Sequence, residues 1–253
     1  MRIFIDGFGI VAESITKKLI ENHDIRKKDL FINTYSTSEN LQYLNYLDTE
    51  ALNFVKKKYS DKSLYDSIKR FNPDYIFSLY AKRIFPKKIL DLANKGSLNL
   101  HPSMLPEYKG CFSAPWVIIN KERETGITFH EMNENIDEGD ILFQKKIPLN
   151  GNETAFSLYN LLCSTFIIEF DRFFSNLKLG KIQRLKMSSG GKYYSRELPF
   201  NGIIDSDWEE SQIECFIRAM FFPPKKGALV KINDNFVEVS SISEYKSLLQ
   251  EKH

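Results

Sequence analysis

The feature that most constrains the fold is the alternation of short apolar runs with helical patterns along the first hundred residues. Strand-length apolar runs occur at 3–5, 30–32, 75–80 and 97–100. Between them, apolar residues recur at helical spacing, most clearly after Gly9. A parallel pair of strands needs a long crossover, and a helix is the usual one. The sequence therefore predicts a doubly wound, mostly parallel α/β sheet of the Rossmann-like type.

The pattern changes after residue 125. Residues 126–132 and 141–147 alternate between apolar and polar side chains, and only 133–140 lie between them. Because that connection is too short for a parallel crossover, we expect an antiparallel pair here. Apolar residues at steps of three and four then predict one amphipathic helix over 153–177, ended by Gly180.

After residue 190 the order of secondary-structure patterns differs, with a helix followed by two short strands. Ser206 and Glu209 have the spacing of a capping box, which predicts the start of a helix. Strand patterns at 229–232 and 236–239, joined by Asn and Asp residues, predict a hairpin. We therefore expect two domains, 1–190 and 191–253, the second a small helix-plus-hairpin extension.

Composition excludes several classes of protein. The 253 residues are 42% hydrophobic and 27% charged, as in ordinary globular proteins. The formal net charge of +2 is too balanced for a dedicated nucleic-acid binder. No apolar run reaches the roughly 20 residues of a membrane helix. The first residues lack the pattern of a signal peptide, so we expect a cytoplasmic protein.

The first turn carries a partial nucleotide-binding signal. Gly7-Phe8-Gly9 follows a strand, and glycines let backbone N–H groups approach phosphate oxygens. A dinucleotide site also needs an acidic residue at the end of the second strand, where this chain has Asn33 and Thr34. We therefore expect no NAD binding. A plain tight turn and a contact with another phosphate both remain open.

Asn99 and His101 form the most informative polar pair. They are two residues apart at the end of an expected strand, so both side chains lie on one face. Ligands bind at the carboxyl ends of strands in open α/β sheets. An amide beside an imidazole can stabilise an oxyanion while a proton moves. The alternative is a buried Asn and His that only hold the following loop.

A second polar cluster lies in the acidic loop at 131–140. Asp137 follows the apolar Ile136, so it is the carboxylate that we expect to turn inward. Paired with His101, it would orient the imidazole. The three cysteines, Cys111, Cys163 and Cys215, are far apart, and no residue set has the spacing of a metal site.

These stretches carry a family resemblance. Asn99 to Ser103, with Pro106, Tyr108 and Gly110, resembles the signature of folate-dependent formyltransferases. The stretch from Glu124 to Ile141, which contains Asp137, is also similar to that family, and the likeness covers about residues 1–180. It implies a catalytic domain over 1–190 in which Asn99, His101 and Asp137 are catalytic. It also implies 10-formyltetrahydrofolate as co-substrate and no metal.

The same resemblance implies where the folate binds. The pterin would lie between the acidic loop and the stretch Lys82–Phe85, with Arg83 near the glutamate of the folate. The expected folate-binding residues are Arg83, Ile84, Phe85, Asn133 and Asp137.

The tail resembles that of sugar-nucleotide N-formyltransferases. It is too short for the basic barrel of methionyl-tRNA formyltransferases. The implied acceptor is a nucleotide-linked amino sugar, first dTDP-4-amino-4,6-dideoxyglucose, used for O-antigen or another lipopolysaccharide glycan. A homodimer through the C-terminal hairpin is also implied. Glycinamide ribotide formylation and a non-catalytic binding module are the alternatives.

Candidate acceptor-binding residues lie in both parts of the chain. Lys82, Arg83 and the first turn would contact pyrophosphate. Phe221 or Phe222 would stack on the base, unless they pack against the long helix. The full expected set is Gly7, Gly9, Ser78, Lys82, Tyr193, Arg196, Phe221 and Phe222.

Overall fold

A computed structural model describes residues 1–250, which form two compact units. The first unit consists of Met1–His101, Ile127–Gln144 and Cys163–Ser189. The second unit contains Pro102–Gly126, Lys145–Leu162 and the chain from Gly190 onward. The second unit is thus made of three segments, the last of which begins at Gly190, and the division into domains 1–190 and 191–253 stays a prediction.

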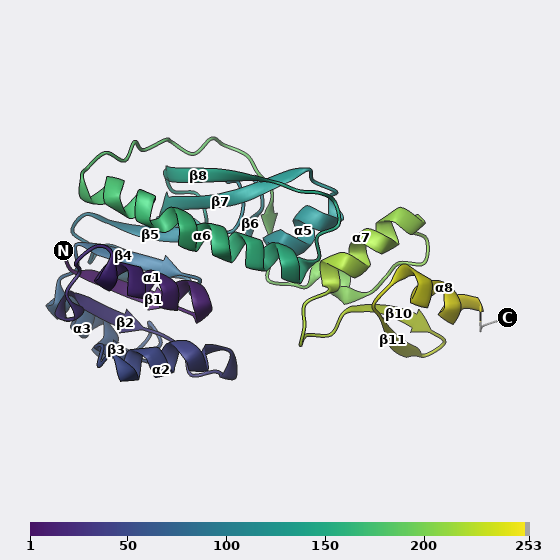
Figure 1. The fold of residues 1–253 in the computed structure, drawn as a ribbon, viewed down its shortest axis with the longest axis horizontal. Helices are drawn as coiled ribbons and strands as arrows, with labels where there is room; N and C mark the ends of the chain where they lie inside the picture. Colours follow the sequence, from purple (N-terminus) through teal and green to yellow (C-terminus); the bar gives the residue numbers. More distant parts are fainter. Residues whose placement is uncertain (251–253) are drawn as a thin grey trace. The chain divides into compact units, whose positions relative to one another are not determined.

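The centre of the fold is a seven-stranded sheet with the order β3-β2-β1-β4-β5-β7-β8 (Figure 1). Its strands are β1 (Ile3–Gly7), β2 (Leu30–Asn33), β3 (Phe54–Val55), β4 (Tyr75–Leu79), β5 (Gly96–His101), β7 (Glu124–Glu131) and β8 (Ile141–Pro148). The first five pair in parallel, and β7 runs antiparallel to β5. The expected mostly parallel α/β sheet is confirmed, and only the two-residue β3 was not expected.

Helices cover both faces of this sheet. They are α1 (Gly9–Glu21), α2 (Leu41–Thr49), α3 (Lys62–Phe71), α4 (Lys87–Leu90) and α6 (Ala155–Lys178). On one face Phe4 and Ile76 pack with Ile68 of α3 and Ile89 of α4. On the opposite face the Phe129 ring lies 5.4 Å from that of Phe166 in α6. Figure 1 shows α1 and α6 on the same side of the sheet.

A row of polar residues crosses the sheet near the carboxyl ends of its parallel strands. In register, Asn33 pairs with Asp6, Asp6 with Ser78, Ser78 with Asn99, and Asn99 with His130. Residues paired in a ladder point to the same face, so these five side chains lie on the face that carries Phe4. We call these five residues the polar row. It puts hydrogen-bonding groups where apolar side chains would otherwise complete the core.

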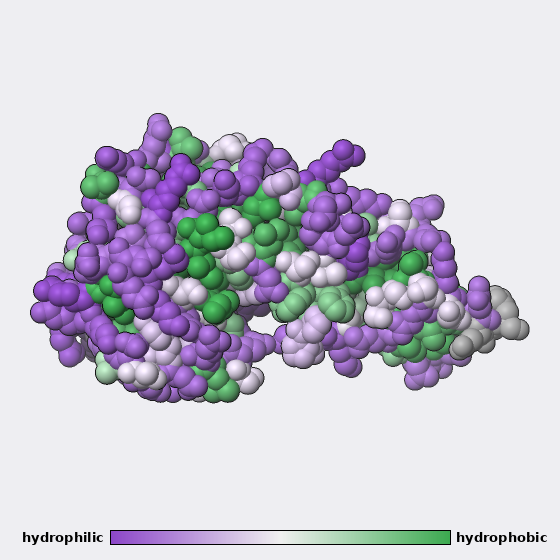
Figure 2. All heavy atoms as spheres, in the orientation of Figure 1, coloured by the Kyte–Doolittle hydropathy of each residue, from purple (hydrophilic) through white to green (hydrophobic). Residues whose placement is uncertain are grey.

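The second unit is built around two packed helices and a hairpin. Its elements are β6 (Lys109–Gly110), α5 (Ser113–Ile119), β9 (Tyr193–Tyr194), α7 (Glu210–Met220), β10 (Ala228–Ile232), β11 (Asn235–Val239) and α8 (Ile242–Gln250). Helices α5 and α7 contact each other, and β10 pairs with β11 antiparallel, which confirms the small C-terminal hairpin. Helix α8 was not expected. Figure 2 shows apolar surface at the hairpin, where Phe236 is 52% exposed.

Two helix starts differ from the sequence-based expectation. Helix α7 is capped by Glu209, whose side chain and that of Gln212 form the capping box, so Ser206 lies outside it. Helix α6 begins at Ala155 rather than at residue 153. The Glu153 carboxylate accepts the backbone N–H groups of Asn150 and Gly151 at 2.8 and 3.0 Å, which holds that residue in the preceding turn. Among the helices of residues 1–250, none is long and apolar enough to cross a membrane.

Candidate active site

The first unit brings together the three residues expected to be catalytic. Asn99 and His101 lie at the carboxyl end of β5, and Asp137 lies in the loop that joins β7 to β8. Asp137 Oδ2 is 3.3 Å from His101 Nδ1, and Asp137 Oδ1 is 3.4 Å from Asn99 Nδ2. His101 and Asp137 are both buried. A carboxylate beside Nδ1 keeps a proton on that nitrogen, so proton exchange with a substrate falls to Nε2.

The backbone of the acidic loop explains why Asp137 points inward. Asp137 has a φ of +56°, a left-handed conformation that Asp adopts more readily than most residues. Two residues later, a Cβ atom on Gly139 would lie 1.9 Å from the carbonyl oxygen of Glu131. The Glu131 N–H also donates to the carbonyl of Asp140 at 2.8 Å. The loop therefore folds tightly back onto β7, and only glycine fits at the closest approach.

His130 belongs to this cluster, although we expected no role for it. Its Nδ1 is 2.7 Å from the carbonyl oxygen of Glu131, which can only accept, so Nδ1 carries a proton. In the neutral ring Nε2 then accepts a hydrogen bond from Asn99 Nδ2 at 3.0 Å. His130 thereby fixes the direction of the Asn99 amide. The sequence could have indicated this contact, because pairing 126–132 antiparallel to 97–100 can place His130 opposite Asn99.

Together these groups can stabilise negative charge and move a proton. The Asn99 amide donates, and the His101 imidazole is oriented by a carboxylate. Such a pair suits the attack of a nucleophile on a carbonyl carbon, in which charge develops on oxygen. Within residues 1–250, no group of three or more His, Cys, Asp or Glu side chains has the geometry to hold a metal ion.

The stretch Lys82–Phe85, expected to bind folate, follows β4. The Phe85 ring is buried 4.8 Å from that of Tyr59, whereas the Ile84 side chain is 70% exposed. Arg83 lies over the ring of Tyr35 at 4.3 Å and donates to the carbonyl of Lys57. Lys82 Nζ is 3.5 Å from the centroid of the Phe8 ring and 3.0 Å from the Glu39 carboxylate. Lys82, Arg83 and Phe85 are thus held by their neighbours, and Ile84 is exposed between Arg83 and Phe85.

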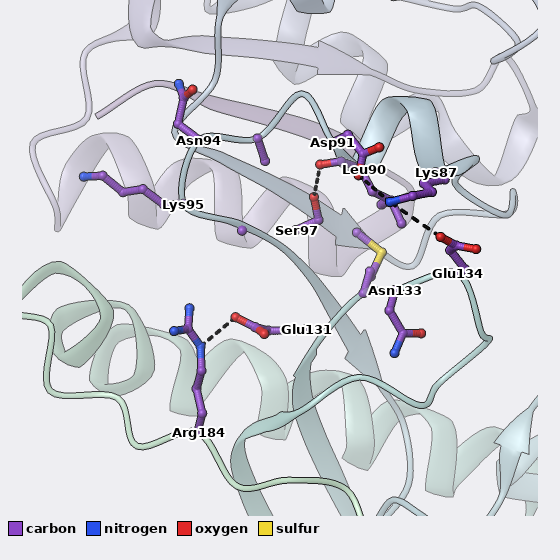
Figure 3. Close-up of a pocket in the computed structure, with 13 residues that line it drawn as sticks. Lys87, Leu90, Asp91, Asn94, Lys95, Ser97, Glu131, Asn133, Glu134 and Arg184 are labelled. Carbon is purple, nitrogen blue, oxygen red and sulfur yellow. Dashed lines mark hydrogen bonds and ion pairs between the residues drawn. The ribbon is translucent and has the colours of Figure 1, made fainter.

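A pocket of about 660 Å³ lies between α4, the start of β5 and the acidic loop (Figure 3). It combines apolar Leu90 and Met132 with polar Ser97 and Asn133. Ion pairs border it: Lys87 with Glu134 at 3.5 Å, and Arg184 with Glu131 at 2.8 Å. Its other lining residues are Asp91, Ala93, Asn94, Lys95 and Gly96. Of the expected folate-binding residues, only Asn133 lines this pocket.

The first turn is tied down by internal hydrogen bonds. The N–H of Phe8 donates to the Leu79 carbonyl at 3.0 Å, and that of Gly9 donates to Asn40 Oδ1 at 2.8 Å. A Cβ atom on Gly7 would lie 2.7 Å from that of Ala12, so close packing of α1 on β1 accounts for this glycine. These contacts fit the plain-turn alternative. A phosphate contact at Gly7 and Gly9 stays a prediction.

The expected acceptor-binding residues of the second unit have different surroundings. Tyr193 is 51% exposed and Arg196 is also exposed. The Phe222 ring packs against Phe156 and Tyr159 of α6, at 5.7 and 5.4 Å. Phe221 is partly exposed, and its carbonyl accepts the N–H of Phe156. Packing against the long helix therefore accounts for Phe222, whereas Phe221 presents apolar surface.

Comparisons of the sequence and of the fold with known proteins agree on one family. The family model described as formyl transferase matches residues 12–164. A GDP-perosamine N-formyltransferase of Brucella melitensis is 37% identical over 250 residues, which span 98% of this chain and 96% of that protein. A 4-N formyltransferase from Francisella tularensis matches the fold with a TM-score of 0.76, at 24% identity over 94% of this chain and 96% of that one. An N-formyltransferase from Helicobacter canadensis, solved with folinic acid and dTDP-3-aminofucose, also gives a TM-score of 0.76, at 23% identity over 95% and 87%. The chain therefore belongs to the formyl transferase family.

Proposed function

We propose that this protein transfers the formyl group of 10-formyltetrahydrofolate to the amine of a nucleotide-linked amino sugar. The observation that carries the proposal is the cluster at the carboxyl end of β5, where Asp137 lies within 3.4 Å of both Asn99 and His101. The relative that matches almost the whole chain supports the sugar-nucleotide acceptor, since it is named a GDP-perosamine N-formyltransferase.

The residues of the cluster take distinct roles in this reaction. 10-Formyltetrahydrofolate supplies an electrophilic formyl carbon on N10. The acceptor amine forms a bond to that carbon, and the bond from carbon to N10 breaks. The Asn99 amide and a protonated His101 hydrogen-bond to the formyl oxygen as charge develops on it. As the bond to N10 breaks, the Nε2 proton of His101 passes to N10, and the neutral imidazole then takes the proton that the amine loses. Asp137 orients the imidazole.

The Asn99 amide has the hydrogens that this role requires. One hydrogen on Nδ2 is committed to His130 at 3.0 Å. The second faces Asp137 Oδ1 at 3.4 Å, a long contact that a formyl oxygen would replace at little cost. Asn99 can therefore donate to the substrate without losing the bond that fixes its orientation.

A pocket beside the acidic loop supports folate binding, although Asn99, His101 and Asp137 do not line it. A pterin is a flat ring with a row of donors and acceptors. The pocket beside the acidic loop combines apolar side chains with Ser97 and Asn133, and its volume of about 660 Å³ lies in the range of small-molecule sites. We assign folate binding to this region and to the stretch Lys82–Phe85, with Arg83, Ile84 and Phe85 contributing.

Two acceptors are the leading candidates. GDP-perosamine comes first, because the relative at 37% identity is named for it. A dTDP-linked 4-amino-4,6-dideoxyglucose comes second, and the Helicobacter canadensis structure with a dTDP-amino sugar supports a thymidine nucleotide. Both sugars carry the amine on C4 of a 6-deoxyhexose, and both would supply an O-antigen or related glycan. Lys82 of the first unit and Tyr193 of the second are expected to contact the acceptor. The proposal also includes a homodimer formed through the C-terminal hairpin, and a cytoplasmic location.

The deciding experiment is a formylation assay with purified protein, 10-formyltetrahydrofolate and a panel of amines. The panel contains GDP-perosamine, the dTDP-linked 4-amino sugar and glycinamide ribotide. We expect formylated product, detected by mass spectrometry, from at least one sugar nucleotide and none from the ribotide. Product from the ribotide alone would assign the chain to purine synthesis. Binding of sugar nucleotide without any product would make it a non-catalytic module.

A further inference from the structure

A buried carboxyl group lies in the polar row away from the catalytic cluster. Asp6, near the carboxyl end of β1, is fully buried. Its Oδ2 accepts hydrogen bonds from the Tyr59 hydroxyl at 2.6 Å and from Asn33 Nδ2 at 2.9 Å, and Oδ1 has no hydrogen-bond partner. Strand β4 separates β1 from β5, so Asp6 is about 10 Å from Asn99 at ordinary strand spacing. Asp6 is therefore too far away to act on the reacting atoms.

The neighbours of Asp6 carry the stretch that follows β4. The ring of Tyr59, whose hydroxyl donates to Asp6, lies 4.8 Å from the ring of Phe85. The Asn33 side chain donates to the Lys57 carbonyl and accepts the Lys57 N–H, both at 3.0 Å. Arg83 donates to that same carbonyl. Phe85 is thus connected to Asp6 through Tyr59, and Arg83 is connected to Asp6 through Lys57 and Asn33.

Tyr35 supplies a third connection. Its hydroxyl accepts the backbone N–H of Lys82 at 2.9 Å, and its ring lies beneath the Arg83 guanidinium. Burial and then the nearby charge of Asp6 raise the pKa of the Tyr35 hydroxyl. Tyr35 therefore holds both Lys82 and Arg83, and it borders the same carboxyl group.

We infer that Asp6 is a positioning residue, which fixes the stretch Lys82–Phe85 through Tyr59, Asn33 and Tyr35 in the conformation that binds folate. The inference rests on the proposed function. A carboxyl group buried this completely is unfavourable for folding, and this role gives a reason for it. Because Asp6 acts on the binding surface and not on the reacting atoms, its loss weakens folate binding and leaves the chemical step intact.

The test compares Asp6→Asn and Tyr35→Phe with a matched control, Tyr43→Phe. The Tyr43 hydroxyl is also buried, but its hydrogen bond joins α1 to α2 through Thr16 at 2.9 Å. Folinic acid binding is measured by calorimetric titration, together with kcat, KM and the melting temperature. We expect Asp6→Asn to raise the Kd for folinic acid about tenfold and Tyr35→Phe about three- to tenfold, the scale of one or two lost hydrogen bonds. For both, kcat at saturating folate stays within about twofold, and Tyr43→Phe changes only the melting temperature.

The outcomes separate the inference from the proposed function. If the parent protein does not bind folinic acid, the proposed function fails. If the parent binds it and Asp6→Asn and Tyr35→Phe bind equally well, the positioning role is wrong and Asp6 is only structural. A loss of kcat at saturating folate with unchanged Kd would also overturn the role. If Asp6→Asn does not fold, Tyr59→Phe decides the question, because it keeps the ring against Phe85 and removes only the hydroxyl that donates to Asp6.

Discussion

The two units of this protein differ in their polar groups more than in their aromatic packing. In the first unit, polar groups lie along one row of the sheet, where Asp6, Asn99 and His130 are buried or half-buried and bonded to their neighbours. Aromatic rings pack together in both units, and in the first unit Phe129 lies 4.2 Å from Phe173. In the second unit the rings form a connected series of Tyr108, Tyr194, Trp116, Phe200, Trp208 and Phe216, with centroids 4.6 to 5.6 Å apart.

From this difference we expect the two units to have different roles in the reaction. Buried polar groups in a sheet are held rigidly, which suits chemistry that depends on fixed donors. In the aromatic series, Tyr108, Tyr194 and Phe216 are buried and form core. Exposed rings of the second unit, such as Tyr193 and Phe221, instead present faces that suit the recognition of a nucleotide base. Substitutions in the first unit should then change turnover most, and substitutions in the second should change acceptor affinity or stability.

The largest effect is expected from His101→Asn. Without an imidazole, neither proton transfer is catalysed, and kcat should fall by about 10² or more. Sugar-nucleotide affinity should change little, because the side chain is placed for chemistry. Steady-state kinetics and calorimetry on the same sample give both quantities. Turnover near that of the parent protein would remove His101 from the mechanism.

Asp137→Asn should come next in size. The amide cannot hold the imidazole as the carboxylate 3.3 Å from Nδ1 does, so we expect kcat to fall by about 10² with the fold intact. Circular dichroism checks the fold. A variant with unchanged kcat would show that another group orients His101.

His130→Phe tests the residue that only the structure identified. Removing Nε2 deletes the 3.0 Å hydrogen bond that directs the Asn99 amide, so kcat should fall about tenfold, the scale of one hydrogen bond. His130→Gln, which keeps an acceptor in this region, is the conservative partner. If the Gln variant recovers part of the rate, the hydrogen bond is responsible; equal rates in both variants would assign the loss to packing.

The aromatic prediction concerns Phe221→Ala and Phe222→Ala in the second unit. Phe222 packs on Phe156 and Tyr159, so its truncation should mainly lower the melting temperature. Phe221 is partly exposed, and loss of a base stack there would cost about 1–3 kcal/mol of sugar-nucleotide affinity. If both variants bind the nucleotide as the parent does, the base stacks elsewhere.

The last prediction concerns NADH, which we do not expect to bind. NADH should show no saturable binding in the micromolar range, because β2 ends in Asn33 instead of an acidic residue and the Gly9 N–H is bonded to Asn40. Calorimetric titration with NADH measures this directly. Micromolar binding would mean that the first turn of the first unit recognises a dinucleotide.

The sequence by itself determined the class of fold and singled out Asn99 and His101 as candidate catalytic residues. Alternating strand and helix patterns depend on neighbours a few positions away, so they could be recognised without coordinates. The common face of Asn99 and His101 follows from their two-residue spacing in a strand, and the motif around them identified the family.

The tertiary structure decided which distant groups meet. The register between β5 and β7 places His130 against Asn99, and the register across β2, β1 and β4 places Asp6 beside Asn33 and Ser78. The inward turn of Asp137 depends on a left-handed φ and on the close approach of Gly139 to β7. Likewise, residues 102–126 and 145–162 belong to the second unit through packing that no local pattern indicates. Each of these depends on contacts between segments far apart in the chain, and a one-residue change of strand register would turn the paired side chains to the opposite face.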